Sequence, residues 1–199
     1  MYASGVDPAS IDHLDEIVHP VAPSMRYLVT EFNIRSSLAD NAQLTSEYGL
    51  EFIRRTSQLV AHPSVAGLFV HAFPFHSVAY WVGDAGIATV SGLSDTRLAG
   101  DDAEPGWHLT PAGELYGLFA RELWRGELVS FEDRGAVQVW TTRWPDGSLR
   151  LGVLNTGPQN VTVARQLDDR LVEVSVGPRG AVVASVAGEL GRVQLTRSW

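Results

Sequence analysis

The chain has 199 residues, of which 45% are hydrophobic, and a formal net charge of −8. This length allows one large domain or two small ones, and the apolar content is ordinary for a folded globular protein. The acidic balance argues against a nucleic-acid partner, because phosphate binding requires clustered positive charge. The sequence contains no cysteine and no lysine, which excludes disulfides, thiolate metal ligands, cysteine nucleophiles and Schiff-base catalysis.

The chain has no recognisable targeting segment. Residues 1–5 have neither a basic start nor an apolar core, so a cytoplasmic location is the default, unless the true amino terminus lies outside this sequence. Residues 56–83 carry no formal charge and are long enough to cross a bilayer, but Pro63, Pro74 and several histidines and serines interrupt them. We interpret this stretch as buried strands, which also have continuous apolar sequences, and expect no membrane partner.

The first third of the chain predicts alternating helices and strands. The expected elements are a helix from Asp7-Pro8 to His19-Pro20, a strand at 26–32, a helix at 47–61 and a strand at 65–73. A strand, a helix and a strand in this order predict a βαβ unit with parallel strands and a right-handed crossover.

The pattern changes twice further along the chain. Residues 74–109, rich in glycine and acids, predict a long loop, and Thr110-Pro111 predicts a new helix that ends at Gly126. Short β-branched segments separated by turn residues follow, which is typical of an antiparallel sandwich. We therefore expect one domain over residues 1–126 and a second over residues 127–199.

Glu31 is the first candidate for chemistry, because it interrupts an apolar strand close to its end. Functional groups of parallel α/β folds collect at the carboxyl ends of strands. A glutamate there can act as a nucleophile, a general acid or base, or a metal ligand. The structural alternative is a carboxylate that caps a loop or pairs with Arg26 or Arg35.

Two sequence stretches resemble one enzyme family. "LVTEFNI", residues 28–34, is similar to the nucleophile strand of retaining glycoside hydrolases with a TIM barrel, and "WHLTPAGELYGLFARELW", residues 107–124, is similar to their last barrel helix. In this clan the catalytic glutamates end strands four and seven, and the similar members are arabinofuranosidase-, xylosidase- and agarase-like. The resemblance implies the last two βα units of a (β/α)8 TIM barrel followed by a C-terminal antiparallel β-sandwich.

The resemblance also implies a role for Glu31. It would be the nucleophile of a retaining double-displacement reaction on an oligo- or polysaccharide, without metal or cofactor. The acid/base carboxyl of the clan usually follows an asparagine, and Asn-Glu occurs nowhere in the sequence. Two strands cannot close a barrel. We therefore expect a C-terminal fragment that is inactive alone and that needs a missing N-terminal barrel segment or associates with itself.

Four other residues are candidates for substrate binding. His71 is expected near the end of the second strand, where it can bind a sugar hydroxyl or Glu31, or be a buried histidine bonded to backbone. Tyr80 and Trp81 can stack on a sugar ring or pack under the loop. Asn33 can orient Glu31 or start the loop by bonding its own backbone.

Other polar and aromatic groups have weaker claims. A metal pair of His71 and His76 lacks a third ligand at suitable spacing. Trp140 and Trp144 are four residues apart, so one strand would present both on one face, as a carbohydrate platform or as core. Two other functions stay open beside the hydrolase: a non-catalytic carbohydrate- or partner-binding scaffold, and a TIM-barrel enzyme in which Glu31 abstracts a proton next to a carbonyl.

Overall fold

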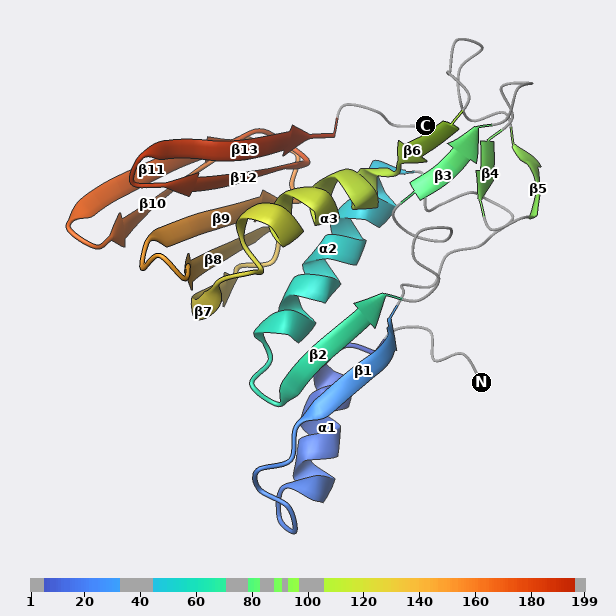
Figure 1. Ribbon diagram of the computed structural model, residues 1–199, viewed down its shortest axis with the longest axis vertical. Helices are drawn as coiled ribbons and strands as arrows, with labels where there is room; N and C mark the ends of the chain where they lie inside the picture. Colours follow the sequence, from blue (N-terminus) through green and yellow to red (C-terminus); the bar gives the residue numbers. More distant parts are fainter. Residues whose placement is uncertain are drawn as a thin grey trace. The chain divides into compact units, whose positions relative to one another are not determined.

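The computed structural model describes residues 6–32, 45–70, 79–82, 88–90, 93–96 and 106–195. The chain forms two compact units, Met1–Gly113 and Glu114–Ser198. Figure 1 follows the chain through the elements. In order they are α1 (Pro8–Val18), β1 (Tyr27–Phe32), α2 (Ser46–Ala61), β2 (Val65–Val70), β3 (Ala79–Val82), β4 (Ala88–Val90), β5 (Leu93–Thr96), β6 (Gly106–Leu109), α3 (Pro111–Glu122), β7 (Glu127–Asp133), β8 (Val137–Arg143), β9 (Leu149–Asn155), β10 (Val161–Leu167), β11 (Arg170–Val176), β12 (Gly180–Ser185) and β13 (Gly188–Gln194).

The helix starts predicted from short polar motifs are confirmed. Asp7 is the N-cap of α1, and its carboxylate accepts a hydrogen bond of 2.9 Å from the backbone N–H of Ser10. The hydroxyl of Thr110 accepts one of 3.0 Å from the N–H of Gly113 at the start of α3. In both helices a proline follows, and its fixed φ and missing N–H suit the first helical position.

The predicted βαβ unit is also confirmed. β1 and β2 pair in parallel, and α2 lies between them in the chain (Figure 1). The amphipathic sequence of α2 buries one face that includes Phe52, Ile53 and Leu59. The ring of Phe52 lies 5.6 Å from that of Phe32, so the end of β1 is fixed in the core.

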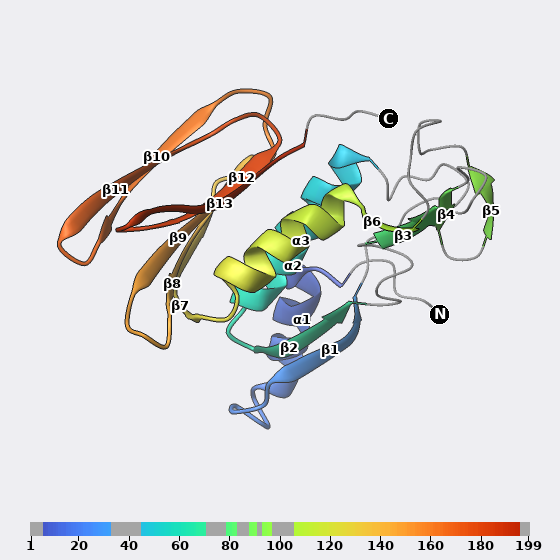
Figure 2. The same ribbon diagram turned by 45° about the horizontal axis from the view of Figure 1, so that its top comes forward.

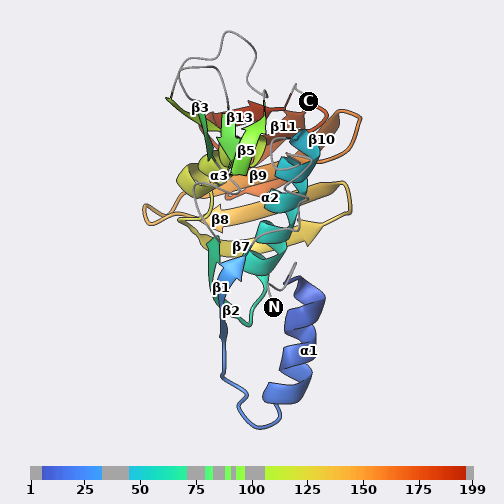
Figure 3. The ribbon, with the colours of Figure 1, turned by 90° about the vertical axis from the view of Figure 1, so that its right-hand side faces the viewer.

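α1 is attached at the opposite, amino-terminal end of these strands. Figure 3 shows that the chain reverses between α1 and β1. The hydroxyl of Ser64, directly before β2, donates a 2.6 Å hydrogen bond to Asp15, and His62 lies 3.1 Å from the carboxylate of Asp12. These polar contacts tie α1 to the strand pair, because only Ile11 of this helix is buried.

The long loop predicted between β2 and the last helix is wrong in part. Four short strands in this interval form an antiparallel sheet in the order β5-β4-β3-β6. Frequent glycines and acids obscured the period-two pattern of segments only three or four residues long.

The expected fold class, the last two βα units of a TIM barrel followed by a sandwich, is contradicted. The described residues contain three helices against thirteen strands, and their only parallel strand pair is β1 with β2. Successive βα units would need more helices than the described residues contain. Between β2 and α3, where a loop was expected, the chain forms the antiparallel sheet β5-β4-β3-β6. The described part of the fold is mostly antiparallel β.

The second unit contains two antiparallel sheets that share an apolar core. One sheet has the order β13-β12-β9-β8-β7, and the other is the hairpin of β10 and β11 (Figure 2). Their facing side chains form the core: Val139, Leu149, Leu151, Val153, Val163, Leu167, Val174, Val176, Val182 and Ala184. Residues 114–122 of α3 belong to this unit, and the ring of Phe119 lies 5.2 Å from that of Trp140.

The side chain of Asn155 links three backbone segments at one end of these sheets. Asn155 is fully buried, and its amide nitrogen donates to the carbonyl oxygens of Gln159 (2.7 Å) and Gly177 (2.9 Å). Its Oδ1 accepts a hydrogen bond from the N–H of Gly157 at 2.9 Å.

The domain boundary predicted at residue 126 stays a prediction. Among the described residues, no helix combines the length and apolarity needed to span a bilayer.

Candidate functional site

Glu31 occupies the fifth of six positions of β1, at the carboxyl end of a parallel strand pair. Parallel strands present their carboxyl ends at one edge, which is where α/β folds bind ligands. The side chain of Glu31 lies outside the part of the chain that the structure describes.

The backbone around Glu31 is irregular. Val29 pairs with Leu68 and Phe32 with Val70, so three steps along β1 match two along β2, and the register shifts across Thr30 and Glu31. Val29 and Phe32 are both buried, although strict alternation would put them on opposite faces. Such bulges re-aim side chains and are frequent next to active sites. The bulge explains how Phe32 is buried although it lies three residues after the buried Val29.

The expected companions of Glu31 are only partly described. Asn33 and His71 lie outside the described residues. Tyr80 and Trp81 lie in β3, but their side chains are outside the described part as well. The structure therefore does not test whether these four residues meet Glu31.

The sheet that contains Tyr80 and Trp81 also contains Trp107, which was not a candidate from the sequence. In the antiparallel pairing of β3 with β6, Tyr80 is opposite His108 and Trp81 is opposite Trp107. Along β6 exposure alternates, and the side chain of Trp107 is half exposed. The signal was the alternation in Trp107-His108-Leu109, which the expectation of a long loop concealed.

A polar cluster at the other end of the strands serves structure. The Nδ1 atom of His62 accepts the N–H of Ser64 at 3.2 Å, and Asp15 lies 3.2 Å from Nε2 of His19. Burial raises the pKa of Asp15, but the hydrogen bond from Ser64 and the nearby histidines together hold it below its ordinary value. Because the Ser64 hydroxyl donates to a carboxylate rather than to an imidazole, the cluster is not a Ser-His-Asp relay.

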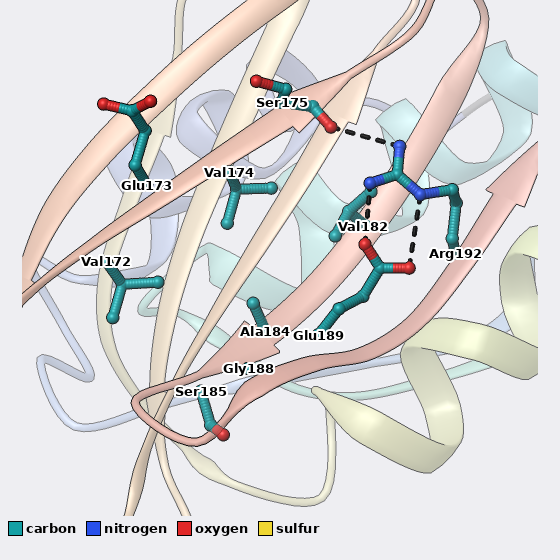
Figure 4. A pocket seen from close by; sticks show the side chains of 10 residues that line it. All are labelled: Val172, Glu173, Val174, Ser175, Val182, Ala184, Ser185, Gly188, Glu189 and Arg192. Carbon is teal, nitrogen blue, oxygen red and sulfur yellow. Dashed lines mark hydrogen bonds and ion pairs between the residues drawn. The ribbon is translucent and has the colours of Figure 1, made fainter.

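A pocket of about 150 Å³ opens in the second unit between β11 and the β12–β13 hairpin (Figure 4). Its floor includes Val174 and Val182. At its mouth the guanidinium of Arg192 donates to the Glu189 carboxylate (2.7 Å) and to the Ser175 carbonyl (3.1 Å). Glu189 raises the pKa of Arg192. Arg192 thus bonds to the backbone of β11 at Ser175, and its charge is paired with Glu189.

The carbohydrate platform considered for Trp140 and Trp144 is wrong, because Trp140 packs in the core. Trp140 is 1% exposed and lies between the rings of Phe119 and Phe131. The ring of Trp144 is covered by the guanidinium of Arg150, 3.4 Å from its centroid. Trp140 therefore presents no face to a sugar, and one face of Trp144 is covered. No group of three metal-ligating side chains occurs among the described residues.

Comparisons with known proteins give a likeness of fold. No family model matches the chain, and no curated protein matches it by sequence. The crystal structure of SrfJ from Salmonella typhimurium is similar, with a TM-score of 0.50 and 14% sequence identity. The match covers 88% of this chain and 37% of that structure, so the chain spans little more than a third of the length of SrfJ. At this identity the likeness concerns the fold alone.

Proposed function

We propose that the chain is the carboxyl-terminal part of a retaining glycoside hydrolase in which Glu31 is the nucleophile. The Glu31 carboxylate attacks the anomeric carbon of the substrate and displaces the leaving group, which forms a covalent glycosyl–enzyme. Water then cleaves this ester with retention of configuration. The acid/base carboxyl, about 5–5.5 Å from the nucleophile in such enzymes, comes from a segment outside these 199 residues.

The observation that carries the proposal is the end of β1. A Thr-Glu-aromatic-Asn sequence that resembles a nucleophile strand coincides with the carboxyl end of a parallel strand and with a shift of register at the glutamate. The two observations are independent, because one comes from the sequence and the other from backbone pairing.

Exposed apolar side chains support the need for a further segment. Leu28 and Phe69, on β1 and β2, are 61% and 57% exposed. Both lie beside Gly67, where an added Cβ would meet a Leu28 methyl group at 3.1 Å. Exposed apolar surface of this kind is typical of an interface. A missing amino-terminal segment or a second copy of the chain would cover it.

Activity measurements test the proposal. A chain extended through the coding sequence that precedes Met1 should hydrolyse aryl arabinofuranosides or xylosides, and the 199-residue chain should not. Glu31→Gln should lower kcat of the extended chain on the order of a thousandfold or more. The matched control is Glu16→Gln, because Glu16 is an exposed carboxylate of α1 in the same unit. Equal loss in both variants, or Glu31-dependent turnover by the short chain, would contradict the proposal.

A non-catalytic scaffold is the second candidate. The exposed Leu28 and Phe69 favour it, since a sheet face that binds a partner needs no carboxylate chemistry. Covalent labelling by a mechanism-based fluoro-glycoside separates the two functions. The hydrolase is labelled at Glu31, whereas the scaffold binds carbohydrate or protein without labelling.

A further inference from the structure

One edge of β11 pairs with no other strand in the described part of the chain, because β10 and β11 form a sheet of two strands. Their hairpin turn has two residues, and Leu167 and Arg170 on either side of it form a cross-strand pair. In such a turn the flanking pair is hydrogen-bonded, and hydrogen-bonded and non-hydrogen-bonded pairs then alternate along the ladder. The backbone N–H and C=O groups of Leu171, Glu173 and Ser175 therefore point away from β10.

The contacts of β11 agree with this orientation. The carbonyl of Ser175 accepts a 3.1 Å hydrogen bond from Nη1 of Arg192, which belongs to β13 and not to β10 (Figure 4). The side chain of Leu171 is 68% exposed, whereas Val172 and Val174 line the pocket of about 150 Å³. The free edge of β11 thus combines outward backbone groups, an exposed apolar side chain and an opening to the core.

The sequence of β11 fits a second copy of the chain at this edge. When two β11 strands pair antiparallel, with Leu171 of one opposite Glu173 of the other, the arrangement is two-fold symmetric and both pairs are hydrogen-bonded. The two Leu171 side chains are then diagonal neighbours on one face. A shift by two residues in either direction would place Glu173 opposite Glu173 or Asp169 of the second copy. Like charges directly opposite each other are destabilising, so the first register is favoured.

Charge complementarity supports the same register. Asp169 of the second copy lies opposite Ser175, the residue whose carbonyl binds the guanidinium of Arg192. Asp169 is an exposed residue of the hairpin turn. Arg192 uses one N–H on each of its three nitrogens for Glu189 and Ser175, and a guanidinium has five N–H donors. It can therefore keep Glu189 and bind a second carboxylate, and the two-fold axis repeats this ion pair.

We propose that two copies of the chain associate through β11, by antiparallel strand addition that joins their two hairpins into one continuous sheet. Each copy contributes Leu171 and Glu173 to the backbone pairing, and Arg192 of each copy binds Asp169 of the other. The interface belongs to the second unit. It depends neither on a catalytic role of Glu31 nor on the exposed apolar side chains of β1 and β2.

A single introduced cysteine tests the register, because the chain has no cysteine of its own. Val172 lies opposite Val172 of the second copy in a non-hydrogen-bonded pair, with Cα atoms about 4.5 Å apart, which a disulfide can bridge. Under mild oxidation Val172→Cys should form a covalent dimer. Ala164→Cys, on β10 directly opposite Glu173, is the matched control and should not. Absence of the dimer for Val172→Cys, or equal cross-linking of both variants, would overturn the inference.

Strand addition is tested by Glu173→Pro and analytical ultracentrifugation of the 199-residue chain. Proline removes an N–H that faces the free edge and leaves the pairing with β10 intact. The wild-type chain should dimerise, and Glu173→Pro should raise the dimer Kd about tenfold or more, because a backbone hydrogen bond is lost at two symmetric positions. Ala164→Pro removes an N–H from the opposite edge of the hairpin and should leave the Kd unchanged. A monomeric wild-type chain, or equal Kd values for the two variants, would contradict the proposal.

A charge reversal decides the question if Glu173→Pro is unfolded by circular dichroism. Asp169→Arg changes an exposed turn residue, keeps every backbone group of β11 and places an arginine against Arg192 of the other copy. It should raise the dimer Kd about tenfold, and Asp169→Asn should raise it less, because it removes the attraction without adding repulsion. A dimer that is equally tight with Asp169→Arg would overturn the inference.

Discussion

At the scale of single residues, Asn155 connects a local turn to the second unit's sheets. Its amide nitrogen donates to the carbonyls of Gln159 and Gly177, and its oxygen accepts a hydrogen bond from the N–H of Gly157. Each such bond contributes about 1 kcal/mol, and a buried partner left unsatisfied costs about 1–3 kcal/mol. The side chain is therefore expected to be important for stability rather than for chemistry.

Replacement of Asn155 tests this role. Asn155→Ala should lower the free energy of unfolding by about 2–4 kcal/mol, measured by urea denaturation. Asn155→Asp should be worse at pH 7, because a carboxylate cannot donate to the carbonyls of Gln159 and Gly177. Asn160→Ala, at an exposed position nearby, is the control and should change stability little. A neutral Asn155→Ala would show that the network is dispensable.

At the scale of elements, two helical glycines are predicted to respond in opposite ways to the same substitution. A Cβ on Gly49 of α2 would meet the backbone N of Ala112 at 2.7 Å, whereas a Cβ on Gly117 of α3 meets nothing within 4 Å. Alanine is a better helix former than glycine by about 1 kcal/mol. Gly117→Ala should therefore raise the melting temperature, and Gly49→Ala should lower it. The same sign for both would contradict this packing of α2.

The attachment of α1 should depend on pH. Because the pKa of Asp15 is lower in the folded chain, its contribution is present above the unfolded value of about 3.9 and is lost as pH falls through the folded value. Ser64→Ala removes the 2.6 Å hydrogen bond. Its destabilisation at pH 7, measured by denaturation, should shrink in more acidic solution. Ser24→Ala, exposed in the turn after α1, should show no such dependence. A constant Ser64→Ala difference down to pH 3 would contradict the assignment.

Elements with local signals could be predicted from sequence, and those that depend on distant pairing could not. Asp7-Pro8 and Thr110-Pro111 define helix starts within a few residues, so both were predictable. β7 carries no alternating apolar pattern, because it is an exposed edge strand with four charged or polar residues. The pattern of β13 is equally weak, because Gly188 and Gly191 interrupt it.

At the scale of the whole molecule, the sequence anticipated the parallel pair but not the sheet that follows it. The pairing of Trp81 with Trp107 depends on register across 26 residues, which no local pattern contains. Glu31 could be singled out because a carboxylate in an apolar strand is a local anomaly. The register shift at Glu31 could not be predicted, because it depends on how β1 pairs with Leu68 and Val70 of β2.

The role of Glu31 as a nucleophile is tested most directly by the site of covalent labelling. The extended chain is treated with a 2-fluoro arabinofuranoside or xyloside that carries a good leaving group, and its peptides are mapped by mass spectrometry. One glycosyl group should be added to the peptide that contains Glu31; it should be absent from Glu31→Gln and retained in Glu16→Gln. A glycosyl group on another carboxylate, with Glu31 unmodified, would contradict it.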